Sequence, residues 1–506
     1  MKNLFKRTFL TVFVLVLVGC SSDLDQDNPN KLSEGTFWQT ERQLQQGGIA
    51  AYDQLQNLDL YSQGVSFRFT ALSDEGTNKW PWEFRDFVKF TLADTDQFGR
   101  GFWIENYALI GRAYQVLERE PEFNLPALAG EMQFLVSLGY FNLVGLFGEN
   151  VAYVDGIQDG LDKPSTAENG ELYSLMENLL LTAIPNLPIT YPELDYGRVT
   201  KGAAQTLLAK IYMQQHRYAD AAPLLKAVID SGQYQLLTNF SDNFTETGMV
   251  NSEAVFVVNF SENGTAENTD TSFRYMMFAI SGERGVYGDL TATNLMLRAF
   301  NAEEAATGSK DSRMDPTIIH PTSSLLYYGL SGEAWAATSA KPDSLQTGFM
   351  KYSEQDAVGN NVDPISGLAT NRANLLDGGT DYIVLRYADV LLMYAEVLNE
   401  QGMTADAVAF VDQVRARADR PGLLTAYPSA IASKAAFFDR LKQERILELS
   451  GENCRFFDLK RWGMYNSELQ DEDNDFETFI DGKNEVEGIP QTELDLNSNL
   501  RPNQAN

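Results

Sequence analysis

The chain has 506 residues, with 39 lysines and arginines against 70 aspartates and glutamates, which gives a formal net charge of −31 at pH 7. Binding to a phosphate backbone depends on Lys and Arg displacing counterions, so no nucleic-acid partner is expected. The 2 histidines and 2 cysteines are too few for a Cys/His zinc module or a disulfide framework. The hydrophobic share of 44% is that of a globular protein with a sizeable core.

Residues 1–19 are predicted to be a lipoprotein signal peptide. Positive charges near the start precede a mostly apolar run over residues 8–18, which is shorter than the about 20 residues that a membrane-spanning helix needs. The run ends in LVGC, and a small residue before Cys20 resembles the bacterial site at which the cysteine is acylated. The alternative is an ordinary signal peptide with a chance cysteine.

Residues 20–35 are predicted to be a flexible acidic tether, because a polar stretch such as SSDLDQD does not bury enough apolar surface to fold. Acidic residues directly after an acylated cysteine resemble the signal that sends Bacteroidetes lipoproteins to the outer face of the outer membrane. Acyl chains on Cys20 then provide the expected membrane anchor. Cys454 is left without an intrachain partner, and its apolar-flanked helical context predicts a buried, inert thiol.

Apolar residues at helical spacing predict a scaffold of helices. The first covers residues 41–58, with Thr40 as its cap. A helix within residues 99–118 is expected to pair with one within residues 128–147, and a late helix covers residues 434–448.

Two longer segments, residues 202–232 and 387–417, share one pattern of apolar and small residues. Aligning Ala209 with Ala395 brings further alanines and valines of the two segments into register. Small residues at these places let two antiparallel helices approach closely, which resembles tetratricopeptide-type helix pairs. Each pair leaves an apolar face uncovered, so further helices are expected to stack on it.

Three long stretches between the helices are predicted to be poorly helical: residues 59–96, 238–292 and 308–380. They are rich in Gly, Ser, Asn, Thr and aromatic residues, and only residues 255–258 read as a short strand. Three of the six tryptophans lie in these stretches, which argues for function over disorder. The expected fold class is therefore mainly α, a rigid helical scaffold that carries long aromatic-rich loops and a few short strands.

Four motifs, in this order along the chain, resemble the SusD/RagB family of outer-membrane nutrient-binding lipoproteins. They are residues 131–148 (EMQFLVSLGYFNLVGLFG), 385–402 (LRYADVLLMYAEVLNEQG), 444–463 (ERILELSGENCRFFDLKRWG) and 488–499 (GIPQTELDLNSN). With the lipoprotein site, the resemblance spans essentially the whole mature chain. One departure is Val136-Ser137, where the family pattern leads us to expect an arginine after the Phe-Leu pair.

The resemblance implies one SusD-like unit over residues 36–506, with an N-terminal part over 36–245 and a C-terminal part over 246–506. It also implies a surface lipoprotein without catalysis or cofactor, which captures glycan and delivers it to a TonB-dependent, SusC-like transporter. The charged residues of the late motifs then form a structural ion-pair network along the helices. These residues are Arg386, Glu444, Arg445, Glu448, Arg455, Asp458 and Arg461.

Residues 78–85 (NKWPWEFR) suit a sugar-binding platform, because aromatic planes bind the flat apolar faces of sugar rings. Pro81 fixes its own φ and restricts Trp80. In an extended segment Trp80 and Trp82 point the same way, since side chains at i and i+2 share a face. The alternative is that both indoles plug the scaffold.

A second platform is predicted at Trp335 with Tyr327 and Tyr328, in a loop over residues 323–340 whose Gly and Ser neighbours indicate exposure. In the family, ligand aromatics come from an early loop and from a loop in the later half, and these positions match that layout. Polar contacts are expected from Arg68, Asp74 and Asn78. Reserve candidates are Tyr275, Arg284 and Tyr287, and the core is expected to take Trp38, Trp103 and Trp462.

No metal site is predicted. Residues 471–475 (DEDND) begin like a calcium loop, but Phe476 and Gly482 stand where an EF-hand needs Gly and Glu. The acidic surface favours a neutral glycan such as a β-glucan. Two alternatives stay open: a SusD-like binder of a non-glycan cargo such as peptide, and a glycoside hydrolase that uses paired carboxylates on the helical scaffold.

Overall fold

The computed structural model describes residues 37–77, 85–91, 97–159, 161–245, 250–261, 290–327, 331–337, 347–352, 355–357, 379–469 and 479–503. The predicted signal peptide, the tether with Cys20, and the acidic residues 471–475 lie outside these ranges. The chain divides into two compact units, residues 1–46 and 47–506. The expected division near residue 245 stays a prediction.

Helix α2 (Glu41–Asp53) confirms the first predicted helix and its cap, because the Gln43 N–H donates to Thr40 Oγ1 at 3.3 Å. The helix ends earlier than predicted. A 3₁₀ turn (Gln54–Gln56) and a π turn (Leu58–Ser62) follow it.

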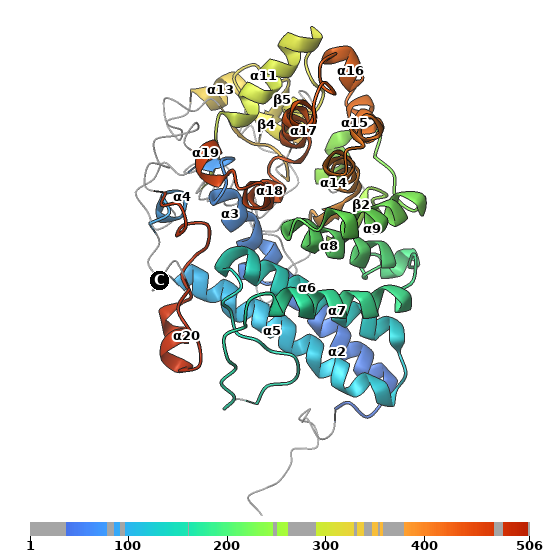
Figure 1. Ribbon diagram of the computed structural model, residues 1–506, viewed down its shortest axis with the longest axis vertical. Helices are drawn as coiled ribbons and strands as arrows, with labels where there is room; N and C mark the ends of the chain where they lie inside the picture. The colour runs from blue at the N-terminus through green and yellow to red at the C-terminus, as the bar shows by residue number, and fades with distance from the viewer. Residues whose placement is uncertain are drawn as a thin grey trace, which may run out of the picture. The chain divides into compact units, whose positions relative to one another are not determined.

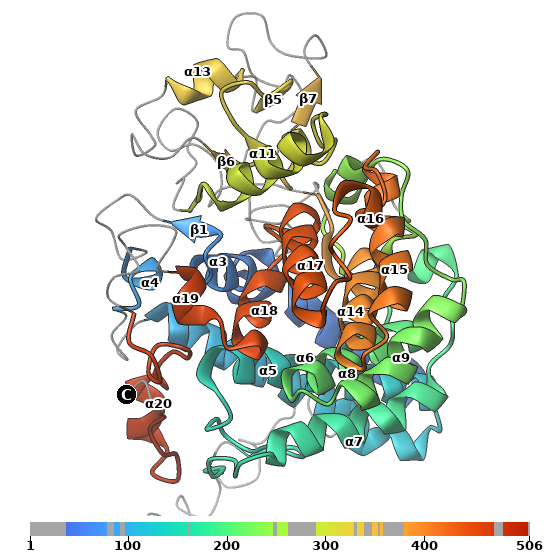
Figure 2. The ribbon, with the colours of Figure 1, turned by 45° about the horizontal axis from the view of Figure 1, so that its top comes forward.

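The other long helices of the described chain confirm the predicted scaffold and add to it. They are α5 (Gln97–Arg119), α6 (Pro126–Phe147), α7 (Glu171–Asn186), α8 (Lys201–Gln214), α9 (Tyr218–Asp230), α11 (Leu295–Thr307), α14 (Tyr387–Glu400), α15 (Thr404–Arg417) and α17 (Lys434–Leu449). The predicted pairs α5–α6, α8–α9 and α14–α15 pack side by side, and α14 also packs on α9 and α17 (Figures 1 and 2). Helix α7, which was not predicted, packs against both α6 and α8.

Small residues set the spacing of these helices. A Cβ added at Gly139 of α6 would lie 3.0 Å from Ile110 Cγ1 of α5, and one at Gly130 would lie 3.0 Å from Leu187 Cγ after α7. Helix α6 ends at Gly148, whose φ of +77° is a conformation that favours glycine. The close approach explains why residues of α6 are buried on nearly every side.

Short strands tie distant parts of the chain together in antiparallel pairs. The predicted strand is confirmed as β2 (Ala254–Val258), which pairs with β8 (Tyr382–Arg386) just before α14. The other described pairs are β1 (Gly76–Thr77) with β3 (Thr291–Ala292), β4 (Ile318–Ile319) with β6 (Gly348–Phe349), and β5 (Leu325–Tyr327) with β7 (Gln355–Ala357).

Shorter helices occur both within the stretches predicted to be poorly helical and in the later part of the chain. They are α3 (Gly64–Ala71), α4 (Arg85–Val88), α12 (Met314–Thr317), α13 (Gly332–Ala336), α16 (Leu423–Ala426), α18 (Cys454–Trp462), α19 (Tyr465–Leu469) and α20 (Gln491–Leu496). Short 3₁₀ turns cover Glu120–Glu122, Glu193–Asp195 and Phe240–Phe244. The prediction for residues 59–96 was wrong at α3, because all eight of its residues are buried and the sequence shows no apolar stripe.

Among the helices that the structure describes, none combines the length and the apolar character needed to cross a bilayer.

The start of α3 provides a sharp stability test. A Cβ at Gly64 would lie 2.2 Å from the backbone oxygen of Asp59, which is not free to move. Gly64→Ala is therefore expected to lower the free energy of unfolding by about 2 kcal/mol, measured by urea denaturation. Gly111→Ala is the matched control within α5, because its Cβ would meet nothing within 4 Å. That change is expected to add about 0.5–1 kcal/mol, and equal effects of the two substitutions would contradict the packing.

Candidate functional site

Five predicted binding residues have side chains that the structure does not describe. Asn78, Trp80 and Trp82 belong to residues 78–84, and Tyr328 is also outside the described ranges. Tyr327 ends β5, where its backbone pairs with Gln355, but the surroundings of its side chain are not described. The reserve candidates Tyr275, Arg284 and Tyr287 are outside the described residues as well. All of these stay predictions.

The exposure predicted for Trp335 was wrong, because its side chain is only 3% exposed. It lies in α13, which is N-capped by the Ser331 hydroxyl accepting the Ala334 N–H at 3.1 Å. A Cβ at Gly348 of β6 would lie 3.0 Å from Trp335 Cζ2, so the indole packs against this strand. The Ser and Gly neighbours that indicated a loop serve instead as a cap and as a site of close packing.

Arg68 and Asp74 were also wrongly assigned to ligand contact, because both are fully buried. The Arg68 guanidinium lies 5.0 Å from the Phe102 ring and donates to the Gly64 carbonyl at 3.4 Å. The Asp74 carboxylate accepts bonds of 2.9 and 2.6 Å from the guanidinium of Arg455. These charges join α3, α5 and α18 and do not face a ligand.

The backbone nevertheless brings the ends of three undescribed segments to one place. Thr77, the residue before the tryptophan segment, pairs with Thr291, the second residue after segment 262–289. Thr347, the first residue after segment 338–346, donates its hydroxyl to the carbonyls of Ala292 and Thr293 at 3.1 and 2.9 Å. Segments that are far apart in the sequence therefore start or end side by side.

This meeting point, which we call the β1–β3 base, stands on packed core. Figure 2 shows α11, β6, α13, β5 and β7 together on one side of the paired helices, with β1 at the end of α3. One continuous cluster of buried apolar residues joins α3, α11, β4, β6 and α17; it includes Phe67, Ala71, Leu290, Met296, Phe300, Ile318, Phe349 and Ile446. A rigid base of this kind is what a recognition loop needs to hold its side chains in place.

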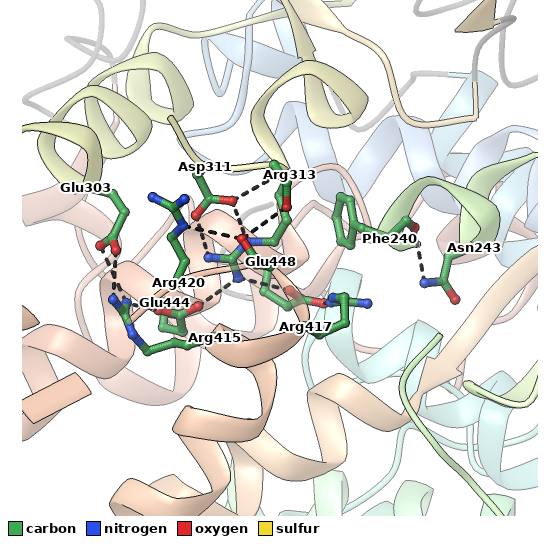
Figure 3. A network of polar contacts seen from close by, with 12 residues as sticks. Phe240, Asn243, Glu303, Asp311, Arg313, Arg415, Arg417, Arg420, Glu444 and Glu448 are labelled. Atoms are coloured by element: carbon green, nitrogen blue, oxygen red, sulfur yellow. Dashed lines mark hydrogen bonds and ion pairs between the residues drawn. The ribbon is translucent and has the colours of Figure 1, made fainter. Parts of the chain in front are cut away.

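The charged residues of the late motifs form the predicted structural network. Arg313 bonds Glu444 at 2.7 Å and Glu448 at 3.0 Å, while Arg415 bonds Glu444 at 2.8 Å and Glu303 at 2.7 Å. Figure 3 shows these side chains pointing toward one another beneath α11. Burial raises the pKa of Glu448, but the guanidinium groups of three arginines outweigh it and hold that pKa below its ordinary value. Each carboxylate is buried and paired, so the network offers no accessible acid or base for catalysis.

The remaining charged residues of the motifs are also held in the predicted ion pairs. Arg445 holds Asp458 with bonds of 2.6 and 2.9 Å, and Arg461 bonds Glu396 at 2.6 Å. Cys454 is half-buried and not fully buried as predicted; its Sγ lies 3.8 Å from Asp389 Oδ2, and desolvation with the Asp389 charge raises the pKa of the thiol. In the described ranges, no group of three or more His, Cys, Asp or Glu side chains is arranged to hold a metal ion.

A cavity of about 390 Å³ opens between residues 189–200, which lead into α8, and residues 233–234 and 250–257, which include most of β2. Its volume lies within the range of about 300–1,000 Å³ that small-molecule sites occupy. Three half-buried tyrosines line it: Tyr191, Tyr196 and Tyr234.

One buried carboxylate organises a wall of this cavity. Glu131 of α6 accepts hydrogen bonds from the Tyr191 hydroxyl at 2.5 Å, the Tyr52 hydroxyl at 2.8 Å and Arg198 Nη2 at 2.6 Å. The Arg198 guanidinium also lies over the Tyr191 ring at 4.6 Å. Burial and the Glu131 charge raise the pKa of Tyr191, so this hydroxyl stays protonated and donates. The wall is fixed before any ligand arrives.

The cavity was not predicted from the sequence. Its tyrosines lie outside helices, where helical periodicity carries no information, and the residues that fix them are Glu131 of α6, Thr200 and Asn251. The Tyr-Pro and Tyr-Gly pairs at 191–192 and 196–197 were the available signal, since Pro and Gly next to an aromatic residue restrict how the ring is presented.

Comparison with known proteins gives consistent matches. The SusD family model matches residues 252–504. SusD-like protein P2 of Formosa agariphila is 26% identical to this chain over 99% of the chain and 99% of that protein.

Solved structures show the same fold. A SusD superfamily protein of Bacteroides vulgatus superposes with a TM-score of 0.79 at 23% identity, over 92% of this chain and 99% of that one. A laminarin-binding SusD-like protein superposes with a TM-score of 0.72 at 25% identity, over 92% and 99%. The predicted mainly α, SusD-like fold class is confirmed.

Proposed function

Because this chain belongs to the SusD family, we propose that it is a cell-surface lipoprotein that captures glycan by aromatic stacking. It hands the bound oligosaccharide or polysaccharide to a TonB-dependent, SusC-like transporter in the outer membrane. The observation that carries the proposal is the β1–β3 base. There, Thr77 beside Thr291 joins the tryptophan segment to a second long segment on packed core.

Trp80 and Trp82 are the proposed centre of the site, with Tyr327 and Tyr328 as further ring contacts and Asn78 as a polar contact. Indole faces match the apolar faces of sugar rings, and the rings around Pro81 lose little freedom on binding. Trp335, Arg68 and Asp74 take no part, because they are buried in the scaffold.

The proposed ligand is a neutral glycan, with a β-glucan as the first choice. The net charge of −31 disfavours a polyanion through long-range repulsion. One solved relative is a laminarin-binding protein, and laminarin is itself a β-glucan. Acylation of Cys20 supplies the proposed membrane anchor. No catalysis and no cofactor are proposed, since binding and transfer require neither.

The test is affinity electrophoresis of the mature chain in gels that contain laminarin, other neutral glucans, or alginate. We expect retention by a neutral glucan and none by alginate. The Trp80→Ala/Trp82→Ala variant is expected to bind at least about tenfold more weakly, a loss of about 1.4 kcal/mol, with unchanged thermal unfolding.

Tyr173→Ala, at a half-buried position of α7, is the matched control and is expected to bind as the original chain does. Full retention by the double tryptophan variant would contradict the proposed site. Release of reducing sugar from the bound glycan would contradict the absence of catalysis, and retention of peptides in place of all glycans would contradict the ligand class.

A further inference from the structure

We propose that the cavity between residues 189–200 and residues 233–234 and 250–257 is a second oligosaccharide site, distinct from the tryptophan platform. It extends the proposed function, since it would take the same class of neutral glycan. Figure 1 shows β2, α8 and α9 on the opposite side of the view from α4, which directly follows the tryptophan segment.

The three tyrosine rings of the cavity are held in place by their hydroxyl groups. The Tyr191 hydroxyl donates to Glu131, and that of Tyr234 lies 2.8 Å from Thr200 Oγ1. The Tyr196 hydroxyl accepts the Asn251 N–H at 3.3 Å. Arg198 covers one face of the Tyr191 ring, and the Tyr387 ring stacks on that of Tyr234, so a sugar would meet the remaining faces. Rings fixed in this way lose little further side-chain freedom on binding.

Polar groups surround the rings with the donors and acceptors that sugar hydroxyls require. The lining includes the Asn251 and Gln233 amides and the carboxylates of Glu193 and Asp195. Carboxylates and amides bind the hydroxyl edges of a sugar, while the rings bind its apolar face. This mixture of flat apolar and polar groups is typical of a ligand site and differs from a packing defect, which is apolar.

The charge of the lining favours a neutral ligand. Arg198 is the cation among the lining residues, and it is already paired with buried Glu131 at 2.6 Å and lies 3.6 Å from Asp195. Glu193 adds a further exposed carboxylate. With more acids than bases at the site, an anionic sugar would be repelled, and the volume suits the end of a chain of a few sugars better than a long polymer.

The experiment uses laminarihexaose with a photoreactive diazirine at its reducing end, mixed with the full mature chain. After irradiation, mass spectrometry maps the labelled peptides. We expect label in residues 189–200 or 233–257, both in the original chain and in the Trp80→Ala/Trp82→Ala variant. Unlabelled laminarihexaose in excess is expected to suppress it.

Two variants test the cavity itself. Tyr196→Ala removes one ring and is expected to reduce label there by at least roughly tenfold. Thr190→Trp, at an exposed lining position, fills the cavity while leaving the ring contacts of the scaffold in place, and is expected to do the same. Tyr173→Ala, outside the lining, is the control and is expected to leave label unchanged.

The outcomes separate this inference from the proposed function. Label confined to the tryptophan segment and its neighbours would overturn the second site and support the proposed one. Label in the cavity alone would support the second site and overturn the tryptophan platform. Label nowhere above the level seen with excess hexaose would overturn both sites. Cavity label that Tyr196→Ala and Thr190→Trp leave unchanged would overturn the second site alone.

Discussion

Replacing Arg386 with leucine is expected to lower the free energy of unfolding by about 3–5 kcal/mol. The Arg386 side chain is buried, and its guanidinium bonds Glu253 and Glu448 at 2.6 Å each. It also holds Glu452 through Nε and Nη2, both at 2.7 Å. Without Arg386, these buried carboxylates lose a shared cation, and leucine supplies no hydrogen-bond donor.

The position of Arg386 explains why one residue has so large an effect. It ends β8 and directly precedes α14, while its partners come from the turn before β2, from α17 and from the turn that follows α17. Its three nitrogens bond in a fixed fork, which a lysine does not reproduce, so Arg386→Lys is expected to recover only part of the loss.

Guanidinium chloride denaturation followed by circular dichroism measures this effect. Arg112→Leu is the matched control, because Arg112 pairs with Asp53 at 3.4 Å across side chains that are 42% and 52% exposed. An exposed pair of this kind contributes at most about 1 kcal/mol. Similar losses for the two leucine variants would show that the buried network does not hold the late helices together.

The helices were the most predictable part of the fold, because their signal is local. In α8, α9, α14 and α15 the apolar residues recur within one or two turns, and small residues mark where partners approach. Helix α3 was missed for the opposite reason. A helix that is buried all round, such as Gly64–Ala71, has no polar face to set against an apolar one.

The site was less predictable, because exposure depends on distant partners. Asp74 is paired with Arg455, which lies 381 residues further along the chain. No local pattern distinguishes a carboxylate with such a partner from one that faces a ligand. The exposure predicted for Trp335 was wrong for a related reason, since Ser331 and Gly332 are as typical of a loop as of the start of the short helix α13.

The cavity was missed for the same reason, because its tyrosines are brought together only by distant partners. Tyr191 is held by Glu131, and Tyr196 by Asn251, so the wall exists only after α6, α8 and β2 have packed. What the sequence supplied was the position of each aromatic residue between helices. What it left open was which of them share a surface, and that depends on tertiary contacts.

Replacing Glu75 with glutamine is expected to change how stability depends on pH. Glu75 directly precedes β1, and its carbonyl accepts the Thr293 N–H at 2.9 Å, so it belongs to the β1–β3 base. Burial, with the neighbouring Asp74 carboxylate, raises the pKa of Glu75 from 4.5 to about 7, against an opposing hydrogen bond from the Gly451 N–H. The folded chain therefore keeps a proton on Glu75 at pH values where the unfolded chain has released it.

This difference in bound protons decides whether the free energy of unfolding rises or falls with pH. Between about pH 4.5 and 7 the folded state holds more protons, so the free energy of unfolding falls as the pH rises through that window. A pKa raised by this amount corresponds to about 3 kcal/mol. Glutamine imitates the protonated acid and still offers an oxygen to the Gly451 N–H, at 3.1 Å in the original chain. The Glu75→Gln variant is thus expected to match the original chain near pH 4.5 and to exceed its stability by about 3 kcal/mol at pH 8.

Urea denaturation at several pH values between 4.5 and 8 checks this result, because the difference between variant and original isolates Glu75 from every other titrating group. Glu304→Gln, on an exposed position of α11, is the control and is expected to run parallel to the original chain. A Glu75→Gln curve that also runs parallel would mean that Glu75 is ionised in the folded protein. In that case the carboxylate directly before β1 would be a stable charge, held by the Gly451 N–H and by the nearby Arg455 guanidinium.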